Sequence, residues 1–410
     1  MAQAAAHGDH EEKTKENGFL DTWRASAPLP IPLSDMSANT VGDKVYLFGG
    51  CSSDQLGYVC SSISSDVFIY DPAADTFETL VGVLPRERYR HAAAVIGTKV
   101  YLLGGRDLND DIIDEVDVFD TSDRTWTTSW EWTSAQSDND AFVRNGAIYA
   151  VGGYDASYDA QDKTDILVPS EGWKLGLSHT TIAAMTVTRG DFAVVQGNGD
   201  LVYAFGGWSD SNGFCTPLAS AEVYDPSADT WTAIGDLAVA RGDKASGLLH
   251  GRIFAVGGES KASCDDEVSA VTDVEVYAPD SDTWEVVGDL PESAFRFASA
   301  TWRHTIYVFG GQKTARFCTK YNATCNELIN ATWGFTESYD HSNNGLSAGA
   351  TAGVVLACLA VVVGLAAAWH YRAKLGCGNT DTTNGEAVEV EHFKKFKANA
   401  DGDFETTPTV

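Results

Sequence analysis

The chain has 410 residues, with 28 Lys and Arg against 58 Asp and Glu and a formal net charge of −30. A field of that sign repels phosphate, so nucleic acid is excluded as an expected partner, and solubility is the ordinary consequence of the acidity. Hydrophobic residues make up 44% of the chain and 11 residues are Trp, which indicates a folded protein rather than a disordered one.

The N-terminal residues 1–18 are expected to be disordered. They contain no apolar run of the secretory type, so we expect either a signal upstream of Met1 in a longer product or translocation driven by a distant segment. The next stretch, "GFLDTW" (18–23), carries a "DTW" that recurs in "SADTWTAI" (227–234) and "SDTWEVV" (281–287). In those two places it ends a repeated unit, whereas here it precedes the first one.

Six near-identical segments follow, and they set the architecture. They read "VYLFGG" (45–50), "VYLLGG" (100–105), "IYAVGG" (148–153), "VYAFGG" (202–207), "IFAVGG" (253–258) and "IYVFGG" (306–311), and their second Gly residues are spaced by 55, 48, 54, 51 and 53. A period near 50 residues made of short apolar runs is typical of a β-propeller. No 3.6-residue pattern lies between the segments, which excludes a parallel βαβ sheet.

Each unit has the content of four antiparallel strands. An apolar run and a turn precede the double Gly, and a polar loop follows it. An alternating strand such as "DVFIYDP" (66–72) or "AEVYDP" (221–226) comes next, and an outer strand then carries an aromatic residue, Phe77, Trp126, Trp231 or Trp284. The third unit departs from this pattern, because "TDILVPSEGWKLG" (164–176) lacks the Tyr-Asp-Pro step.

Hydrophobic residues, a double Gly, a spaced Tyr and then a Trp resemble the kelch repeat over residues 19–335. The resemblance implies an all-β, six-bladed kelch-like β-propeller. Side chains at the double Gly would collide with the next blade, and the loops after them need positive φ. We therefore give these repeat glycines a structural role: Gly49, Gly50, Gly104, Gly105, Gly152, Gly153, Gly206, Gly207, Gly257, Gly258, Gly310 and Gly311.

The sixth unit predicts how the ring closes. Its segment "NELINATWGFT" (326–336) is interpreted as the third strand, with Trp333 and Phe335 as its aromatic pair. No fourth strand follows it, so the N-terminal "GFLDTW" should complete this blade and place Trp23 beside residues 326–336. Such closure removes the open sheet edges.

Six cysteines lie in the loops that follow double Gly pairs. We predict the disulfides Cys51–Cys60, Cys215–Cys264 and Cys318–Cys325, although six cysteines permit 15 connectivities. The same loops carry a candidate binding face of aromatic residues, with solvated acidic surface as the alternative: Tyr58, Tyr154, Tyr158, Trp208, Phe214, Phe317 and Tyr321. Sequons predict N-glycosylation at Asn322 and Asn330.

Arginines precede the innermost strands, at a position where kelch-like repeats often have one. They are candidates to surround the mouth of the central channel and hold a carboxylate, with pairing to Asp191 or Asp243 as the alternative: Arg88, Arg90, Arg189, Arg241 and Arg296. Two of these sites spell "RGD" (189–191 and 241–243), which we interpret as coincidence with the repeat position rather than as an integrin ligand.

The segment from 346 to 369 has the composition of a transmembrane helix, and Arg372 and Lys374 follow it. The positive-inside rule puts the C-terminus in the cytosol and the propeller outside or in a lumen, where disulfides and sequons belong. The expected domains are a disordered 1–18, a propeller at 19–336, a linker at 337–345, the helix at 346–369 and a cytosolic tail at 370–410. Overlapping G-x-x-x-G motifs (345–353) suggest a homodimer through the helix.

No catalytic residue, metal ligand or cofactor is assigned, because no nucleophile–base–orienter set can be assembled from the spacing. We expect a membrane-anchored recognition module, of the adhesion or receptor type, that binds a protein or glycan through the loop face. The first alternative is a membrane-tethered carbohydrate-active enzyme of the sugar isomerase or oxidase type, with its site at the channel mouth. The second is a cytosolic kelch scaffold anchored by its tail.

Overall fold

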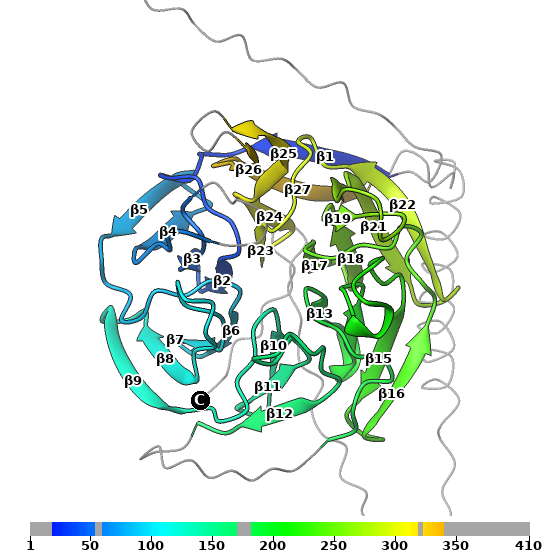
Figure 1. Cartoon of the computed structure of the whole chain (residues 1–410), viewed down its shortest axis with the longest axis horizontal. Helices are drawn as coiled ribbons and strands as arrows, with labels where there is room; N and C mark the ends of the chain where they lie inside the picture. The colour runs from blue at the N-terminus through cyan, green and yellow to red at the C-terminus, as the bar shows by residue number, and fades with distance from the viewer. Residues whose placement is uncertain (1–18, 54–59, 170–181, 319–322, 340–410) are drawn as a thin grey trace, which may run out of the picture. The chain divides into compact units, whose positions relative to one another are not determined.

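The computed structural model describes residues 19–53, 60–169, 182–318 and 323–339. In this part of the chain, six antiparallel sheets stand around a common axis as the blades of a propeller (Figure 1). Each blade runs from its first strand at the axis to its last strand at the rim. The six-bladed, all-β prediction is therefore confirmed.

The first three blades follow the chain in order. Blade 1 contains β2 (Ser37–Val41), β3 (Lys44–Phe48), β4 (Val67–Asp71) and β5 (Thr76–Leu80). Blade 2 contains β6 (Ala92–Ile96), β7 (Lys99–Leu103), β8 (Glu115–Asp120) and β9 (Thr125–Glu131). Blade 3, the unit that departs from the repeat, has three strands among the described residues: β10 (Asp140–Arg144), β11 (Ala147–Val151) and β12 (Thr164–Leu167). Its early Trp173 lies outside them.

Blades 4 and 5 carry extra elements in their loops. Blade 4 contains β13 (Ala193–Gln196), β14 (Val202–Phe205), β15 (Ala221–Asp225) and β16 (Thr230–Ile234), with the 3₁₀ turns η1 (Asn198–Asp200) and η2 (Asp210–Asn212). Blade 5 contains β17 (Ala245–Leu249), β18 (Arg252–Val256), β21 (Asp273–Ala278) and β22 (Thr283–Asp289). The short hairpin of β19 (Glu259–Ser260) and β20 (Ser269–Ala270) lies in its loop.

Blade 6 closes the ring with both ends of the propeller sequence. Its order is β23 (Ala298–Trp302), β24 (Thr305–Phe309), β27 (Thr332–Tyr339) and β1 (Phe19–Ala25). Trp23 pairs with Phe335, and their ring centroids are 5.1 Å apart. The predicted closure by the N-terminal strand is confirmed, and the Tyr339 end of β27 lies three residues beyond the predicted end of the propeller.

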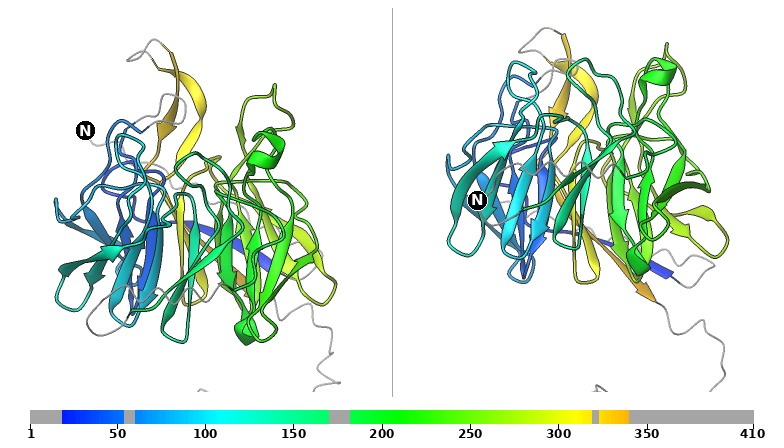
Figure 2. Two further views of the ribbon diagram at one scale, coloured as in Figure 1. Left: turned by 60° about the horizontal axis from the view of Figure 1, so that its bottom comes forward. Right: turned by 90° about the horizontal axis from the view of Figure 1, so that it is seen from below.

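The third strand of blade 6 differs from its predicted span. Residues 326–328 belong instead to β26 (Ala323–Leu328), which pairs with β25 (Gln312–Cys318) in a separate hairpin that projects above the blades (Figure 2). The third strand begins only at Thr332. The apolar run that the repeat leads one to expect is interrupted by the turn at Asn330, whose side-chain amide donates to the Leu29 carbonyl at 3.2 Å.

The core lies between the blades, with one buried hydrophobic cluster at each of the six interfaces. Aromatic residues of the third and fourth strands pack there, as Tyr224 and Trp231 do in blade 4. Trp231 donates its indole N–H to the Ala183 carbonyl, and Trp284 donates to Gly235. Burial of apolar faces between neighbouring sheets, rather than within one sheet, therefore stabilises the ring.

The double glycines bring the blades together at the axis. All twelve have positive φ, as the repeat pattern predicts. At Gly104 a Cβ atom would lie 1.9 Å from the backbone oxygen of Gln136 in the next blade, a distance that no side chain can occupy. The pair therefore permits both the turn and the close approach of blades 2 and 3.

Candidate functional site

A closed ring of six residues crosses the central channel, one from each blade. Each lies just before the first strand of its blade and has a φ between 50° and 56°. Each backbone N–H donates to the carbonyl of the equivalent residue in the preceding blade, at 2.8–3.0 Å, and the sixth hydrogen bond returns to the first residue. We call this set the axial ring: Asp35, Arg90, Asp138, Asp191, Asp243 and Arg296.

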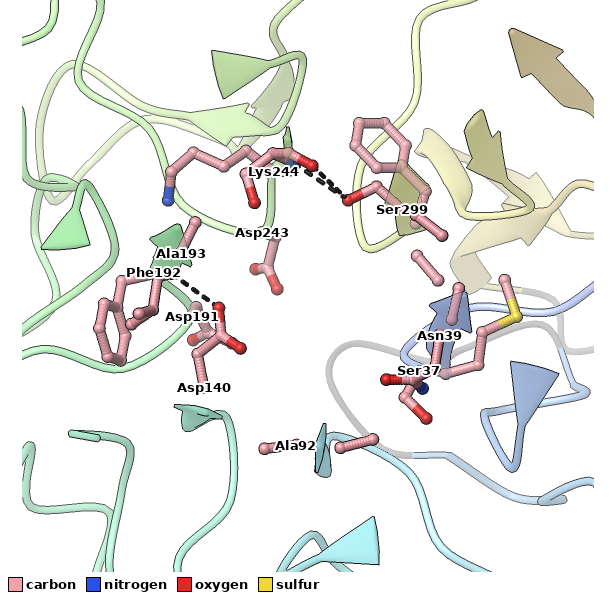
Figure 3. Close-up of a pocket in the computed structure, with 18 of the residues that line it drawn as sticks. Ser37, Asn39, Ala92, Asp140, Asp191, Phe192, Ala193, Asp243, Lys244 and Ser299 are labelled. Carbon is pink, nitrogen blue, oxygen red and sulfur yellow. Dashed lines mark hydrogen bonds between the residues drawn. The ribbon is translucent and has the colours of Figure 1, made fainter. Parts of the chain in front are cut away.

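The axial ring divides the channel into two cavities. All six ring residues line a cavity of about 400 Å³ whose walls are the first strands of the blades, and we call it the strand-side cavity (Figure 3). Arg90, Asp191 and Arg296 also line a second cavity of about 450 Å³ among the loops, which we call the loop-face pocket. The ring therefore forms the floor of the loop-face pocket.

The ring is electrically asymmetric. Arg296, Asp35 and Arg90 occupy neighbouring blades, and Asp35 lies 3.6 Å from Arg90 Nε and 3.9 Å from Arg296 Nε. Asp138, Asp191 and Asp243 occupy the other half. Asp138 lies 3.6 Å from Arg90 Nε, and Asp243 lies 3.4 Å from Arg296 Nε. The half with two arginines and one aspartate therefore has an excess of positive charge, and the half with three aspartates is acidic.

The acidic half brings carboxyl groups close together. Asp138 and Asp191 are hydrogen bonded to each other, and burial together with neighbouring carboxyls raises the pKa of Asp191 well above its usual range. Glu259, which is hydrogen bonded to Asp243, also has its pKa raised by burial and by that carboxyl. Tyr154 Oη donates to Asp191 at 2.9 Å. Carboxyl pairs at this proximity favour one shared proton over two buried charges.

The walls of the loop-face pocket come from blades 3, 4 and 5. Tyr154 and Trp208 directly follow double Gly pairs, and both are at least 95% buried. The Tyr154 ring lies 5.7 Å from that of Phe214 and 6.1 Å from that of Tyr158. Lys261 Nζ lies 5.4 Å from the Trp208 ring. Four of the seven aromatic residues predicted as a binding face therefore converge on one pocket: Tyr154, Tyr158, Trp208 and Phe214.

Two glycines leave room for the aromatic rings of Tyr154 and Trp208. A Cβ atom at Gly190 would lie 2.2 Å from the Tyr154 ring, and one at Gly242 would lie 2.2 Å from Trp208 Nε1. These glycines are the middle residues of the two "RGD" sequences. The following Asp belongs to the axial ring in each case, so both motifs have structural roles and are buried.

Three of the five predicted channel-mouth arginines are not at the mouth. Arg88, Arg189 and Arg241 are fully buried within their blades and line neither cavity. Arg88 Nη2 lies 2.5 Å from Asp117, Arg189 Nη2 lies 2.7 Å from Glu222, and Arg241 pairs with Glu275. We call these the blade arginines.

The predicted alternative, pairing with Asp191 or Asp243, is also wrong for Arg189 and Arg241. The acidic partner of each blade arginine stands on the third strand of its own blade, and the adjacent Asp turns into the axial ring. Only Arg90 and Arg296 line the pocket as predicted.

Lys244 is a buried cation on the other side of the ring. Its side chain runs toward blade 4 rather than into the middle of the strand-side cavity (Figure 3), and its Nζ lies 5.1 Å from the Phe205 ring. Its Nζ has no hydrogen-bond partner among the described residues. Burial, reinforced by Arg189 and Arg241, lowers its pKa from 10.5 to about 7. Met36, Phe192 and Phe297 occupy the equivalent position in other blades.

Two of the predicted disulfides are present. Cys51 is joined to Cys60 within the first loop, and Cys215 is joined to Cys264 between blades 4 and 5. The second bond follows Phe214 directly and lies three residues beyond Lys261, so it ties together two loops that wall the pocket. Cys318 and Cys325 stand on the paired strands β25 and β26, and their bond stays a prediction.

The remaining predicted site residues are not placed at the pocket. Tyr58, Tyr321 and Asn322 lie outside the described residues, as does the side chain of Phe317. Asn330 is exposed in blade 6. The described residues contain no helix long and apolar enough to cross a membrane, and the predicted span at 346–369 lies outside them.

Sequence reasoning missed most of the axial ring. Asp35, Asp138, Glu259 and Lys261 were not among the predicted residues, and Asp191 and Asp243 were considered only as ion-pair partners. A signal does exist: the ring residue precedes the first Gly of its pair by 14 positions in five blades and by 15 in blade 4. The position is Asp in four blades and Arg in two, and this change of residue type conceals the regularity.

Comparison with known proteins agrees with this architecture. The chain is 26% identical over 258 residues to kelch repeat protein M-T8 of Myxoma virus (strain Lausanne), which covers 63% of this chain and 47% of that protein. It is 23% identical over 287 residues to Kelch-like protein 25 of Xenopus tropicalis, covering 68% and 45%. The chain thus spans about half the length of these curated relatives.

A solved structure and a family model complete the comparison. The structure of YjhT superimposes with a TM-score of 0.59 at 13% identity and covers 76% of this chain and 98% of that one, which shows a shared fold alone. The model of the Attractin/LZTR1 β-propeller matches residues 57–317, well over half of the sequence. The chain therefore belongs to the Attractin/LZTR1 β-propeller family.

Proposed function

We propose that this protein is a recognition module that binds a partner protein by taking one of the partner's side chains into the loop-face pocket. The observation that carries the proposal is that Tyr154, Trp208 and Phe214 converge on one pocket, and that the axial ring closes its far end. A pocket of about 450 Å³ with aromatic walls and a few polar groups at its base has the form of a site for an anchoring side chain.

The position of the pocket supports a protein ligand. It opens on the face that carries η2 and the β25–β26 hairpin (Figure 2), and the disulfide Cys215–Cys264 fixes two of its loops. Rigid loops lose less conformational entropy when they bind, so an anchor there contributes more affinity. The axial ring closes the far end, so a ligand enters and leaves through the loop face.

Selection of peptides on the full chain tests this function. A random displayed peptide library is panned against the chain and, in parallel, against Trp208→Ala. Because Trp208 walls the pocket, we expect selected peptides to lose at least about tenfold in affinity for that variant. Trp302→Ala is the matched control, since Trp302 ends β23 on the opposite face, and it should leave the affinity unchanged. Failure to select peptides, or binding indifferent to Trp208, would contradict the proposal.

We further propose that the propeller faces the exterior or a lumen, anchored by the segment at 346–369. The two disulfides support this orientation, because such bonds persist in oxidising compartments. After the membranes are solubilised in detergent, glycosidase treatment should shift the mobility of the chain, and Asn330→Gln should reduce that shift. A cytosolic propeller would show neither change and would be cut by protease added to the cytosolic side.

A glycan is the second candidate ligand for the same pocket. Aromatic rings beside both hydrogen-bond donors and acceptors, here Lys261 and Glu259, also suit a sugar ring. A glycan array probed with the full chain and with Trp208→Ala separates the two ligands. Signal on glycans that vanishes with Trp208→Ala, in the absence of any Trp208-dependent peptide, would favour the sugar.

A further inference from the structure

The charges at the floor of the loop-face pocket are unbalanced. Two ring guanidinium groups lie among five carboxyl groups in or beside the axial ring, those of Asp35, Asp138, Asp191, Asp243 and Glu259. Asp191 and Glu259 line the pocket itself. Arg90 and Arg296 each lie between two or more of these carboxyls, at 3.4–3.9 Å. The positive charge of Arg90 and Arg296 is therefore already compensated by these carboxyls.

Two carboxyls face the pocket with little cationic support. Asp191 forms no ion pair with any described residue, and its neighbours in the ring are Asp138 and Asp243. Glu259 is 97% buried, and its only ion pair with a described residue is the 3.9 Å contact with Arg296 Nη2. No described group donates a hydrogen bond to Glu259 Oε2. A buried carboxyl oxygen without a donor, in the lining of a cavity, marks the place of an absent donor.

The aromatic walls stand over this acidic half. Tyr154 bonds Asp191 directly, and Trp208 packs on Gly242, beside Asp243. The faces of these rings attract cations, as Lys261 shows where its ammonium group lies 5.4 Å from the Trp208 ring. The chain's net charge of −30 also favours the approach of a positive ligand.

We propose that the side chain taken by the loop-face pocket is a lysine or arginine of the partner protein, with Glu259 and Asp191 as its carboxyl partners and Tyr154, Trp208 and Phe214 as its aromatic wall. This inference rests on the proposed function and specifies its ligand. The bound cation supplies the donor that Glu259 Oε2 lacks. It also places a positive charge beside two carboxyls that have little cationic support among the described residues.

An anionic side chain is the competing occupant, because Arg90, Arg296 and Lys261 also line the pocket. It is less favourable, since it would add a negative charge beside five carboxyls while both guanidinium groups already have partners. Pairing with either guanidinium group would require an existing ion pair to break, which leaves Lys261 as the cation of the lining that could balance the added charge. The charge of the conserved position in selected peptides decides between the two.

The test uses the peptides selected on the full chain. We expect them to share one Lys or Arg, and replacement of that residue by norleucine or citrulline should weaken binding about tenfold. Glu259→Gln should weaken the parent peptide by a similar factor and should abolish most of the difference between the parent and its neutral analogue. Glu285→Gln, on the exposed face of β22, is the matched control and should change neither affinity.

The outcomes distinguish the cationic anchor from the more general proposal that the loop-face pocket binds a protein. Trp208-dependent peptides that share an Asp or Glu, or that bind equally well as neutral analogues, would overturn the cationic anchor and leave the pocket as the protein site. Peptides that bind regardless of Trp208 would overturn both. The peptide-side substitutions keep the test valid even if Glu259→Gln alters folding, because they leave the protein untouched.

Discussion

The blade arginines and the ring arginines come from the same segment of the repeat but have different roles. Arg88 and Arg90 are two residues apart, yet Arg88 bonds Asp117 and the Gly104 carbonyl inside its blade, whereas Arg90 reaches the axial ring and the loop-face pocket. Blade arginines bond their acids directly, at 2.5 Å for Arg88 and 2.7 Å for Arg189, whereas ring arginines are held by ion pairs of 3.4–3.9 Å. The comparison indicates that the first set holds each blade together and the second forms part of a site.

The largest expected effect concerns the blade set. Arg241→Met leaves Glu275 buried without its cation, which should lower the free energy of unfolding by about 3–5 kcal/mol. Urea denaturation measures the change. Adding Glu275→Gln should recover much of the loss, because the amide oxygen can still accept from the Ala238 or Val239 backbone N–H. An unchanged free energy of unfolding in Arg241→Met would contradict the stabilising role of the blade arginines.

Lys244 is a buried cation that belongs to neither set, and its replacement should raise the free energy of unfolding rather than lower it. Lys244→Met replaces an ammonium that has no hydrogen-bond partner among the described residues, at a position where three other blades have Met or Phe. It should therefore raise the free energy of unfolding by about 1–3 kcal/mol at neutral pH. The folded pKa of Lys244, about 7, lies below its usual 10.5, so the unfolded chain binds more protons between these values.

The sign of the pH effect follows from that difference. The wild-type chain should gain stability as the pH rises from about 7 to 10.5, and the full cost of burying Lys244 should be present below 7. The advantage of Lys244→Met should therefore shrink across this range. Denaturation curves of both proteins at several pH values measure it, and a constant advantage would show that Lys244 keeps its charge in the fold by some other pairing.

The smallest expected effect on stability should accompany a large effect on binding. Gly242→Ala puts a methyl group where Trp208 Nε1 now lies, so the indole must move out of the pocket wall. We expect a loss of about 1 kcal/mol in stability and at least about tenfold in affinity for selected peptides. Thermal denaturation and fluorescence anisotropy measure the two quantities. Unchanged affinity would mean that Trp208 does not shape the ligand site.

The repeat made most of the fold predictable from sequence. Six copies of an apolar run with a double Gly indicate the blades, and the displaced "DTW" of residues 21–23 indicates the closing strand. The β25–β26 hairpin was not anticipated, because its strands lie in a loop that other units leave irregular. A repeat pattern predicts the strands that all units share, and it cannot predict an element that only one unit contains.

The site was less predictable, for a physical reason. The axial ring depends on backbones that converge from six blades. Four of its residues are Asp and two are Arg, so no single unit displays the pattern. The ion pairs of the blade arginines, in contrast, have a signal in the sequence. Three units with an acid at this position of the third strand (Asp117, Glu222 and Glu275) have a blade arginine, but unit 3 combines Asp165 with Gln136. Units 1 and 6 have neither charge and carry Leu33 with Phe68 and Ala294 with Trp333.

The most direct measurement of the central claim is photocrosslinking from the loop-face pocket. A photoreactive phenylalanine analogue is placed at Phe214, at the wall of the pocket, or at Trp302, on the opposite face. With a selected peptide as the partner, we predict crosslinks from position 214, their loss when Trp208→Ala is added, and none from position 302. Equal crosslinking from both positions, or crosslinks from 302 alone, would contradict the assignment of binding to the loop-face pocket.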